Sequence, residues 1–144
     1  MTGPGEGRVP GPGEGRVPGE GRVLGLGIDV VDLDRFRLAI GRTPGLVERV
    51  FTPGERAYAL RKRDPAERLA ARFAAKEATM KALGVGLGAF RFHDVEVTKA
   101  RSGAPSLALT GAAAALAERR GVGAWHIALT HSALIAEAVV LALG

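Results

Sequence analysis

The sequence predicts an α+β fold in which a largely antiparallel sheet packs against helices. Two observations carry this prediction. Helical patterns follow one another over 32–83, instead of alternating with strands as in a parallel α/β fold. The strand-like segments of the second half come as hairpin-like neighbours, 93–99 with 106–110 and 125–131 with 137–143.

The first segment of the chain differs from the rest in composition. Residues 1–23 contain eight of the 21 glycines and four of the eight prolines, and GPGEGRVP occurs at 3–10 and again at 11–18. Such a segment buries too little apolar surface to offset its chain entropy. We expect 1–23 to be a disordered Gly/Pro repeat tail, with a binding tail as the alternative, and 24–144 to form one domain.

The domain opens with one strand and one helix in this prediction. LGLGIDVV at 24–31 is an apolar run typical of a buried strand. The next segment, 32–41, carries apolar residues at helical spacing and ends at Gly41, a residue placed to stop the helix.

Capping signals predict the next two helices. TPGE at 52–55 matches a capping box with proline at the first helical position, so a short helix should cover 53–61. DPAE at 64–67 repeats these signals and predicts the longest helix of the chain. This helix should run to Leu83, with Gly84 as its C-cap.

Turn residues separate the elements of the second half. GVGLG at 84–88 predicts a loop, and RSGAP at 101–105 predicts a turn between two strands. The alanine-rich segment 111–121 predicts a helix bounded by glycines, and SALIA at 132–136 links the last two strands. The predicted order is therefore β-α-α-α-β-β-α-β-β.

Composition excludes several classes of protein. The chain has no cysteine, which excludes disulfide scaffolds, thiolate zinc sites and cysteine nucleophiles. No apolar run reaches the roughly 18 residues that span a bilayer, and the N-terminus lacks the apolar segment of a secretory signal. We therefore expect a cytoplasmic protein without a membrane partner. The net charge of +5 favours an anionic partner: nucleic acid, nucleotide or acidic protein.

Asp29 lies in the middle of the first apolar strand. A buried carboxylate needs a cation, hydrogen bonds or a metal ion, because burying it alone is very costly. Position alone leaves two interpretations equal, a structural ion pair or helix cap on one side and a functional carboxylate on the other.

A cluster of charges lies on the long helix. Glu77 shares a helix face with Phe73 and projects inward. Lys81 follows at the spacing of an ordinary helix ion pair, so a solvated pair is the simplest interpretation of these two residues alone. Arg72 and Lys76 lie in the same three turns, however, and one acid among three bases suits a polyphosphate with a divalent cation. Two acids, here Glu77 and Asp29, suit Mg²⁺, and no His/Cys spacing supports zinc.

Three further features are weaker signals. Lys62 and Arg63 belong to a basic run that is either solvated or part of an anion site. His131 ends a strand, where it either touches a phosphate or is a satisfied core histidine. Gly84 and Gly86 let the backbone approach a ligand, but they follow a helix, so a helix stop and a turn are the default interpretation.

Several segments together resemble the holo-acyl-carrier-protein synthase family, which comprises small 4'-phosphopantetheinyl transferases. The segments run in order along the domain: GLGIDVVDLDRF (25–36), LVERVFTPGE (46–55), RFAAKEATMKALGVGLG (72–88), DVEV (94–97), SGAPSLALTG (102–111) and IALTHS (127–132). The repeat tail has no counterpart in the family. The resemblance implies the α+β fold of these transferases and a homotrimer with its active site between subunits.

The resemblance also implies an activity. Such enzymes move the 4'-phosphopantetheine arm of coenzyme A onto a serine of apo acyl carrier protein in fatty acid biosynthesis, and they release adenosine 3',5'-bisphosphate. Asp29 and Glu77 match the Mg²⁺ ligands, and Lys81 matches the lysine that contacts the pyrophosphate. Arg72 and His131 match positions near the phosphates of coenzyme A. We also expect the basic residues and glycines singled out above to bind coenzyme A: Lys62, Arg63, Lys76, Gly84 and Gly86.

Arg35 matches a basic position that meets the acidic helix of the carrier protein, and Arg42 is expected to be a second. The family has further basic residues where this chain has Pro44 and Gly45.

The chemistry of the residues agrees with this activity. An alcohol attacks a phosphate of a diphosphate ester, so negative charge must be neutralised by Mg²⁺ on Asp29 and Glu77, with Lys81 alongside. The base that accepts the serine proton is Glu77 or a water molecule that it orients.

Two rival functions are a small nucleic-acid-binding module and a non-catalytic carrier-binding protein. The first would explain the charge, but a buried Asp29 beside the binding face repels phosphate unless a metal intervenes. The second does not explain why Asp29, Glu77 and Lys81 occur together. We therefore expect no nucleic-acid partner.

Overall fold

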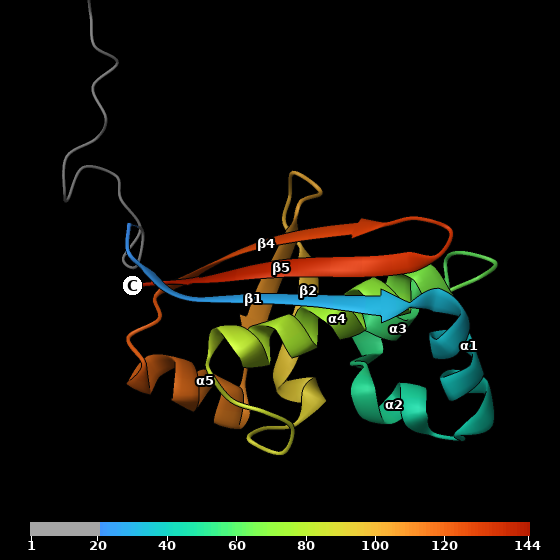
Figure 1. Ribbon diagram of the computed structural model, residues 1–144, viewed down its shortest axis with the longest axis horizontal. Helices are drawn as coiled ribbons and strands as arrows, with labels where there is room; N and C mark the ends of the chain where they lie inside the picture. The colour runs from blue at the N-terminus through green and yellow to red at the C-terminus, as the bar shows by residue number, and fades with distance from the viewer. Residues whose placement is uncertain (1–20) are drawn as a thin grey trace, which may run out of the picture.

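The computed structural model describes residues 21–144, so most of the predicted repeat tail, 1–20, lies outside the described residues (Figure 1). Four helices, not the three expected, follow the first strand. The elements are β1 (Val23–Asp32), α1 (Leu33–Arg42), α2 (Leu46–Val50), α3 (Pro53–Ala59), α4 (Ala66–Ala82), the 3-10 turn η1 (Phe92–Asp94), β2 (Val95–Lys99), β3 (Pro105–Leu109), α5 (Gly111–Arg119), β4 (Ala124–His131) and β5 (Ile135–Leu143).

All strand pairs in the described chain are antiparallel, which confirms the predicted fold class. β5, the last strand, lies between β1 and β4 in a three-stranded sheet, and β2 and β3 form a separate two-stranded sheet. Figure 1 shows the long helix α4 running along β1 and β5 on one side of the larger sheet. No helix within 21–144 is long and apolar enough to cross a membrane.

Helix α4 approaches β1 at backbone distance. A Cβ atom at Gly27 would overlap the carbonyl oxygen of Ala78, and one at Gly25 would overlap that of Ala82. Glycine on the strand and alanine on the helix therefore allow a contact that any larger residue would block. This contact fixes how α4 presents its side chains to the end of β1.

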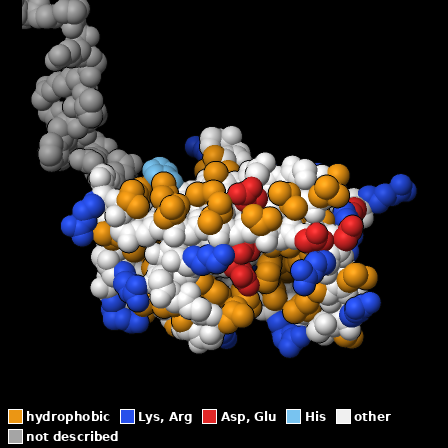
Figure 2. Space-filling view, in the orientation of Figure 1, with side chains coloured by type: hydrophobic (Ala, Val, Ile, Leu, Met, Phe, Trp, Pro, Cys, Tyr) orange, Lys and Arg blue, Asp and Glu red, His pale blue; other side chains and the backbone are white. Residues whose placement is uncertain are grey.

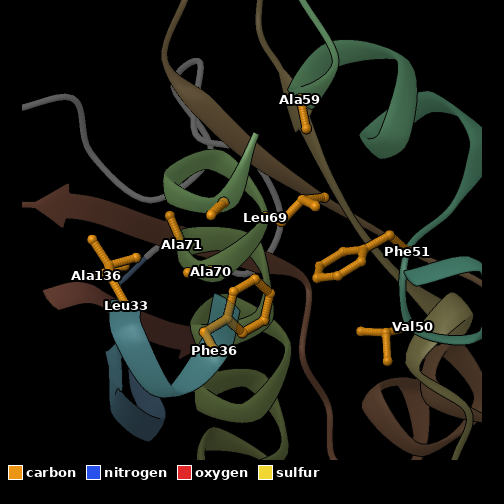
Figure 3. Close-up of a cluster of buried hydrophobic side chains, with 10 residues drawn as sticks. Leu33, Phe36, Val50, Phe51, Ala59, Leu69, Ala70, Ala71 and Ala136 are labelled. Carbon is orange, nitrogen blue, oxygen red and sulfur yellow. The ribbon is translucent and has the colours of Figure 1, made fainter. Parts of the chain in front are cut away.

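Aromatic residues fill the core between α4 and the three preceding helices. Figure 3 shows Phe36 of α1 and Phe51 after α2 converging near Leu69 of α4. The ring centroids of Phe36 and Phe73 are 6.0 Å apart, and those of Phe73 and Phe92 are 5.7 Å apart. This stack lies under the cavity described below.

A buried ionic network joins α3, α4 and β2. Glu55 completes the predicted capping box with Thr52, and its carboxylate also accepts a hydrogen bond from the Val97 N–H and pairs with Lys76 at 2.8 Å. Lys76 Nζ donates to the carbonyl of Phe92 at 2.9 Å and also to that of Val95. Both charged side chains of the pair are fully buried, and burial lowers the pKa of Lys76.

Several predicted boundaries differ from the structure. Helix α1 continues through Gly41 to Arg42, and α3 ends at Ala59 rather than at residue 61. His93 and Asp94 form a 3-10 turn, so β2 begins two residues later than expected. α2 was not predicted because its five residues are too few to show a helical period.

Candidate active site

Asp29 and Lys81 form the centre of the site. Gly27 and Asp29 lie on the face of β1 that meets α4, because alternate residues of a strand share a face. Lys81 Nζ lies 3.2 Å from Asp29 Oδ1 and donates to the Ile28 carbonyl at 2.8 Å. Asp29 therefore takes part in an ion pair. The residue that caps α1 is not Asp29 but Asp32, whose carboxylate accepts a hydrogen bond from the backbone N–H of Arg35.

Glu77 is the second carboxylate of the site. Lys81 pairs with Asp29, and within the described chain no ion pair joins it to Glu77, so these two residues are not the solvated helix pair that their spacing allows. Burial, followed by the charge of Asp29, raises the pKa of Glu77, and Lys81 offsets this only in part. Two repelling carboxylates at one place suit a hard divalent cation that takes its remaining ligands from water and phosphate, as Mg²⁺ does.

No group of three or more His, Cys, Asp or Glu side chains within 21–144 could enclose a metal by itself. A cation here would depend on oxygen atoms of a substrate for part of its coordination.

A cavity of about 550 Å³ opens beside the two carboxylates. Asp29, Glu77 and Arg35 of α1 line it together with mostly apolar side chains, which include Phe36 and Phe73. The cavity therefore connects an exposed cation on α1 with the two acids.

A second pocket, of about 240 Å³, collects three of the residues predicted to bind coenzyme A: Lys62, Arg72 and His131. Arg72 is only 5% exposed, and its Nε has no hydrogen-bond partner within the described chain. His131 is exposed rather than a core residue, and its Nδ1 lies 3.6 Å from Glu67 Oε2.

The two groups of residues lie on different sides of α4. Asp29 and His131 both project from the α4 side of the sheet, since they pair with the buried Ala138 and Ala136 of β5. However, β5 separates their strands (Figure 1). On the helix, Arg72 and Glu77 are five residues apart, which places them about 140° apart around its axis. Within one chain, the Asp29 site and the Arg72 pocket are therefore on opposite flanks of α4.

The structure does not bring Lys76 to either place. Its ammonium group is fully buried and held by Glu55, so the expectation that it contacts coenzyme A is corrected: it joins helices and a strand in the core. Gly84 follows α4 in a left-handed conformation (φ 70°), and its N–H donates a hydrogen bond to the Lys81 carbonyl. Both features are typical of a glycine that ends a helix. Arg63 and Arg42 are exposed and line neither cavity.

Sequence reasoning missed three residues of the second pocket, Tyr58, Arg68 and Lys99. They come from α3, α4 and the end of β2. The only signal available was the i, i+4 spacing that puts Arg68 and Arg72 on one helix face.

Comparisons with known proteins place the chain in one family. The family description "4'-phosphopantetheinyl transferase superfamily" matches residues 25–136. A holo-[acyl-carrier-protein] synthase of Frankia alni is 50% identical over 120 residues, which is 83% of this chain and 97% of the relative. One from Streptomyces avermitilis is 48% identical over 122 residues, covering 85% and 98% of the two chains.

Solved structures of such synthases share the fold. The Neisseria meningitidis enzyme aligns with a TM-score of 0.77 and 30% identity over 85% of this chain and all of its own. The Bacillus anthracis enzyme, solved in complex with CoA (3',5'-ADP), aligns with a TM-score of 0.71 and 31% identity over 85% and 97% of the two chains. The chain therefore belongs to the 4'-phosphopantetheinyl transferase superfamily.

Proposed function

We propose that this protein is a holo-acyl-carrier-protein synthase, which transfers the 4'-phosphopantetheine arm of coenzyme A to a serine of apo acyl carrier protein. The other product is adenosine 3',5'-bisphosphate. The observation that carries the proposal is that Asp29 and Glu77 line one cavity and that Lys81 pairs with Asp29 there. Incubation with coenzyme A, Mg²⁺ and apo carrier protein, followed by mass spectrometry of the carrier, tests it directly.

Asp29 and Glu77 would hold Mg²⁺, which supplies positive charge to the diphosphate of coenzyme A when bound. Lys81, held between Asp29 and the Ile28 carbonyl, adds a fixed cation next to the same diphosphate. Lys81, beside the cation that the two carboxylates would hold, would stabilise the negative charge that develops during phosphoryl transfer.

The carrier serine supplies the nucleophile. Its hydroxyl oxygen forms a bond to the β-phosphorus, the bond from that phosphorus to the bridging oxygen breaks, and adenosine 3',5'-bisphosphate leaves. The hydroxyl proton passes to the Glu77 carboxylate or to a water molecule that Glu77 orients. The chain therefore needs no nucleophile of its own.

The position of Arg35 supports carrier docking on α1. The two acids near Arg35 in the sequence are engaged elsewhere: Asp34 pairs with Arg37, and Asp32 caps the backbone of α1. Within 21–144 the guanidinium of Arg35 therefore forms no ion pair. It borders the cavity that leads to Asp29 and Glu77. An acidic carrier helix at Arg35 would therefore place the carrier serine next to the two carboxylates.

We expect Arg35→Glu to raise the Michaelis constant for the carrier about tenfold or more and that for coenzyme A little, because the reversed charge repels an acidic partner. Added salt should shrink the difference, since exposed charges are screened. Arg119→Glu, the same reversal on the exposed end of α5, is the matched control. Equal changes in both Michaelis constants would reject docking at Arg35.

We further propose that the enzyme works as a homotrimer with each active site shared between two subunits. One support is the separation of the Asp29 site from the Arg72 pocket on opposite flanks of α4. The other is an uncovered apolar face of the larger sheet. Leu26, Ile28 and Val30 of β1 point away from α4 and are 60%, 49% and 53% exposed. Figure 2 shows hydrophobic side chains in a row over the larger sheet. A face of this kind is typical of an interface between proteins.

Mixing two variants, each defective on one flank of α4, tests the shared site. Asp29→Asn removes a proposed metal ligand on one flank, and Arg72→Gln weakens the proposed coenzyme A pocket on the other. Co-expressed subunits of a cyclic trimer should recover up to about a quarter of wild-type activity, because that fraction of interfaces joins two intact flanks. Each variant alone is the control, and light scattering should report three copies. Co-expressed trimers with no more activity than the separate variants would place each site within one chain.

A further inference from the structure

A charged contact ties α1 to the start of α4. Arg37, in the middle of α1, donates to Asp64 Oδ2 with two nitrogens, Nη2 at 2.9 Å and Nε at 3.3 Å. Asp64 lies in the loop between α3 and α4, 27 positions further along the chain, and Figure 1 shows this loop next to α1. Within 21–144 no other ion pair connects α1 with another element. We call this contact the Arg37–Asp64 pair.

Asp64 is itself fixed by the helix that follows it. Its Oδ1 accepts a hydrogen bond at 3.0 Å from the N–H of Ala66, the first residue of α4. This hydrogen bond, and then the guanidinium of Arg37, lower the pKa of Asp64, so the carboxylate is ionised at neutral pH. Two guanidinium nitrogens on a carboxylate that is already held define the geometry of the pair better than a single surface contact does.

The opposite side of α1 borders the proposed carrier site. Arg35 and Arg37 are two positions apart, which places them about 200° apart around the helix axis, and of the two only Arg35 lines the cavity beside the two carboxylates. The buried side chains of α1, Leu33 and Phe36, both lie in its first four residues. The Arg37–Asp64 pair therefore restrains the helix beyond this buried part without occupying the side that faces the cavity.

We propose that Arg37 is a positioning residue for the transfer reaction: held by Asp64, it sets the orientation of α1 and so the place of Arg35 relative to the carboxylates. The inference rests on the proposed function, in which an acidic carrier helix docks at Arg35. Because α4 carries Glu77, a restraint between α1 and α4 determines where the serine of a docked carrier lies relative to this carboxylate. Small displacements of a reacting group are enough to slow a reaction.

Two substitutions remove the pair from either side. Arg37→Met keeps the apolar stem without the guanidinium, and Asp64→Asn keeps an oxygen that can accept from the Ala66 N–H. We expect each to lower kcat/KM for the carrier about fivefold, the upper range for an exposed ion pair, without raising the Michaelis constant for coenzyme A. The double variant should be no worse than either single variant, because both remove the same contact.

A direct contact between Arg37 and the carrier predicts a different result. Asp64→Asn would then free a cation for the acidic partner and raise kcat/KM for the carrier, and this outcome would overturn the proposal. Asp34→Asn is the matched control. It removes the other carboxylate that Arg37 contacts, at 3.3 Å, but Asp34 lies on α1 itself and cannot fix that helix against α4. An equal loss in Asp34→Asn would therefore also contradict the positioning role.

Hydrogen exchange separates this inference from the proposed function, because it needs no transfer reaction. We expect Arg37→Met and Asp64→Asn to speed amide exchange in α1 and Asp34→Asn to leave it unchanged. Unchanged exchange in the first two variants, or additive losses in the double variant, would reject the positioning role even if the wild type transfers the arm. A merely structural role would lower the melting temperature and raise both Michaelis constants alike, which would overturn the proposal as well.

Discussion

Glu77→Gln should lower the rate of phosphopantetheine transfer at least about a thousandfold, because it removes one of the two carboxylates proposed to hold Mg²⁺. Asp29→Asn should do the same for the other. Glutamine is nearly isosteric with glutamate, so the domain should stay folded. The rate is measured by mass spectrometry of the carrier at several Mg²⁺ concentrations, with Glu118→Gln on the exposed face of α5 as the control.

The same variant should not be less stable than the wild type in the presence of a chelator. Burial and Asp29 raise the pKa of Glu77 in the folded chain, so folding favours the neutral form of Glu77. The ionised form therefore destabilises the metal-free fold, and this cost grows as the pH rises through the raised pKa. We expect Glu77→Gln to melt at or above the wild-type temperature at pH 7 and the difference to vanish in acid. A lower melting temperature, or full activity, would contradict the assignment of Glu77.

Lys76→Met should destabilise the fold by about 3–5 kcal/mol, the usual cost of leaving one member of a buried ion pair without its partner. Glu55 would then be a fully buried, uncompensated carboxylate against β2. Urea unfolding measures the change. The double variant Glu55→Gln/Lys76→Met should recover part of the loss, since glutamine removes the buried charge and keeps one oxygen that can accept from either the Thr52 or the Val97 N–H group.

Lys81→Met is the matched control, because Lys81 also pairs with a carboxylate, that of Asp29, but its side chain is 54% exposed. Exposed pairs contribute at most about 1 kcal/mol, so this variant should unfold close to the wild type while losing transfer activity. A loss below about 1 kcal/mol for Lys76→Met would mean that the buried network is not needed for the fold.

The features that the sequence predicts are those confined to one element. The capping box of Thr52 and Glu55 is confirmed because its bonds span only three residues. A charge in an apolar strand singled out Asp29, and helical spacing placed Glu77 toward the interior. Both arguments need only the period of one strand or one helix.

The features that could not be predicted depend on contacts between elements. Lys76 and Glu77 are adjacent, yet one is sealed in the core and the other faces a cavity. The difference comes from Glu55, 21 positions away, which no local pattern connects to Lys76. Tyr58 and Lys99 likewise meet only after α3 and β2 have packed beside α4.

The glycine–alanine contact between β1 and α4 has a consequence for ion selectivity. Mg²⁺ requires oxygens at about 2.0–2.1 Å in near-octahedral order, whereas Ca²⁺ accepts 2.3–2.6 Å and irregular shells. Asp29 projects two residues after Gly27, and Glu77 directly precedes Ala78, the residue whose carbonyl Gly27 meets. Because the two backbones are in contact, the space between the Asp29 and Glu77 carboxylates has little freedom to widen. Discrimination against a larger cation at the proposed Mg²⁺ site would therefore depend on Gly27, whose side chain is a single hydrogen atom, rather than on any charged group.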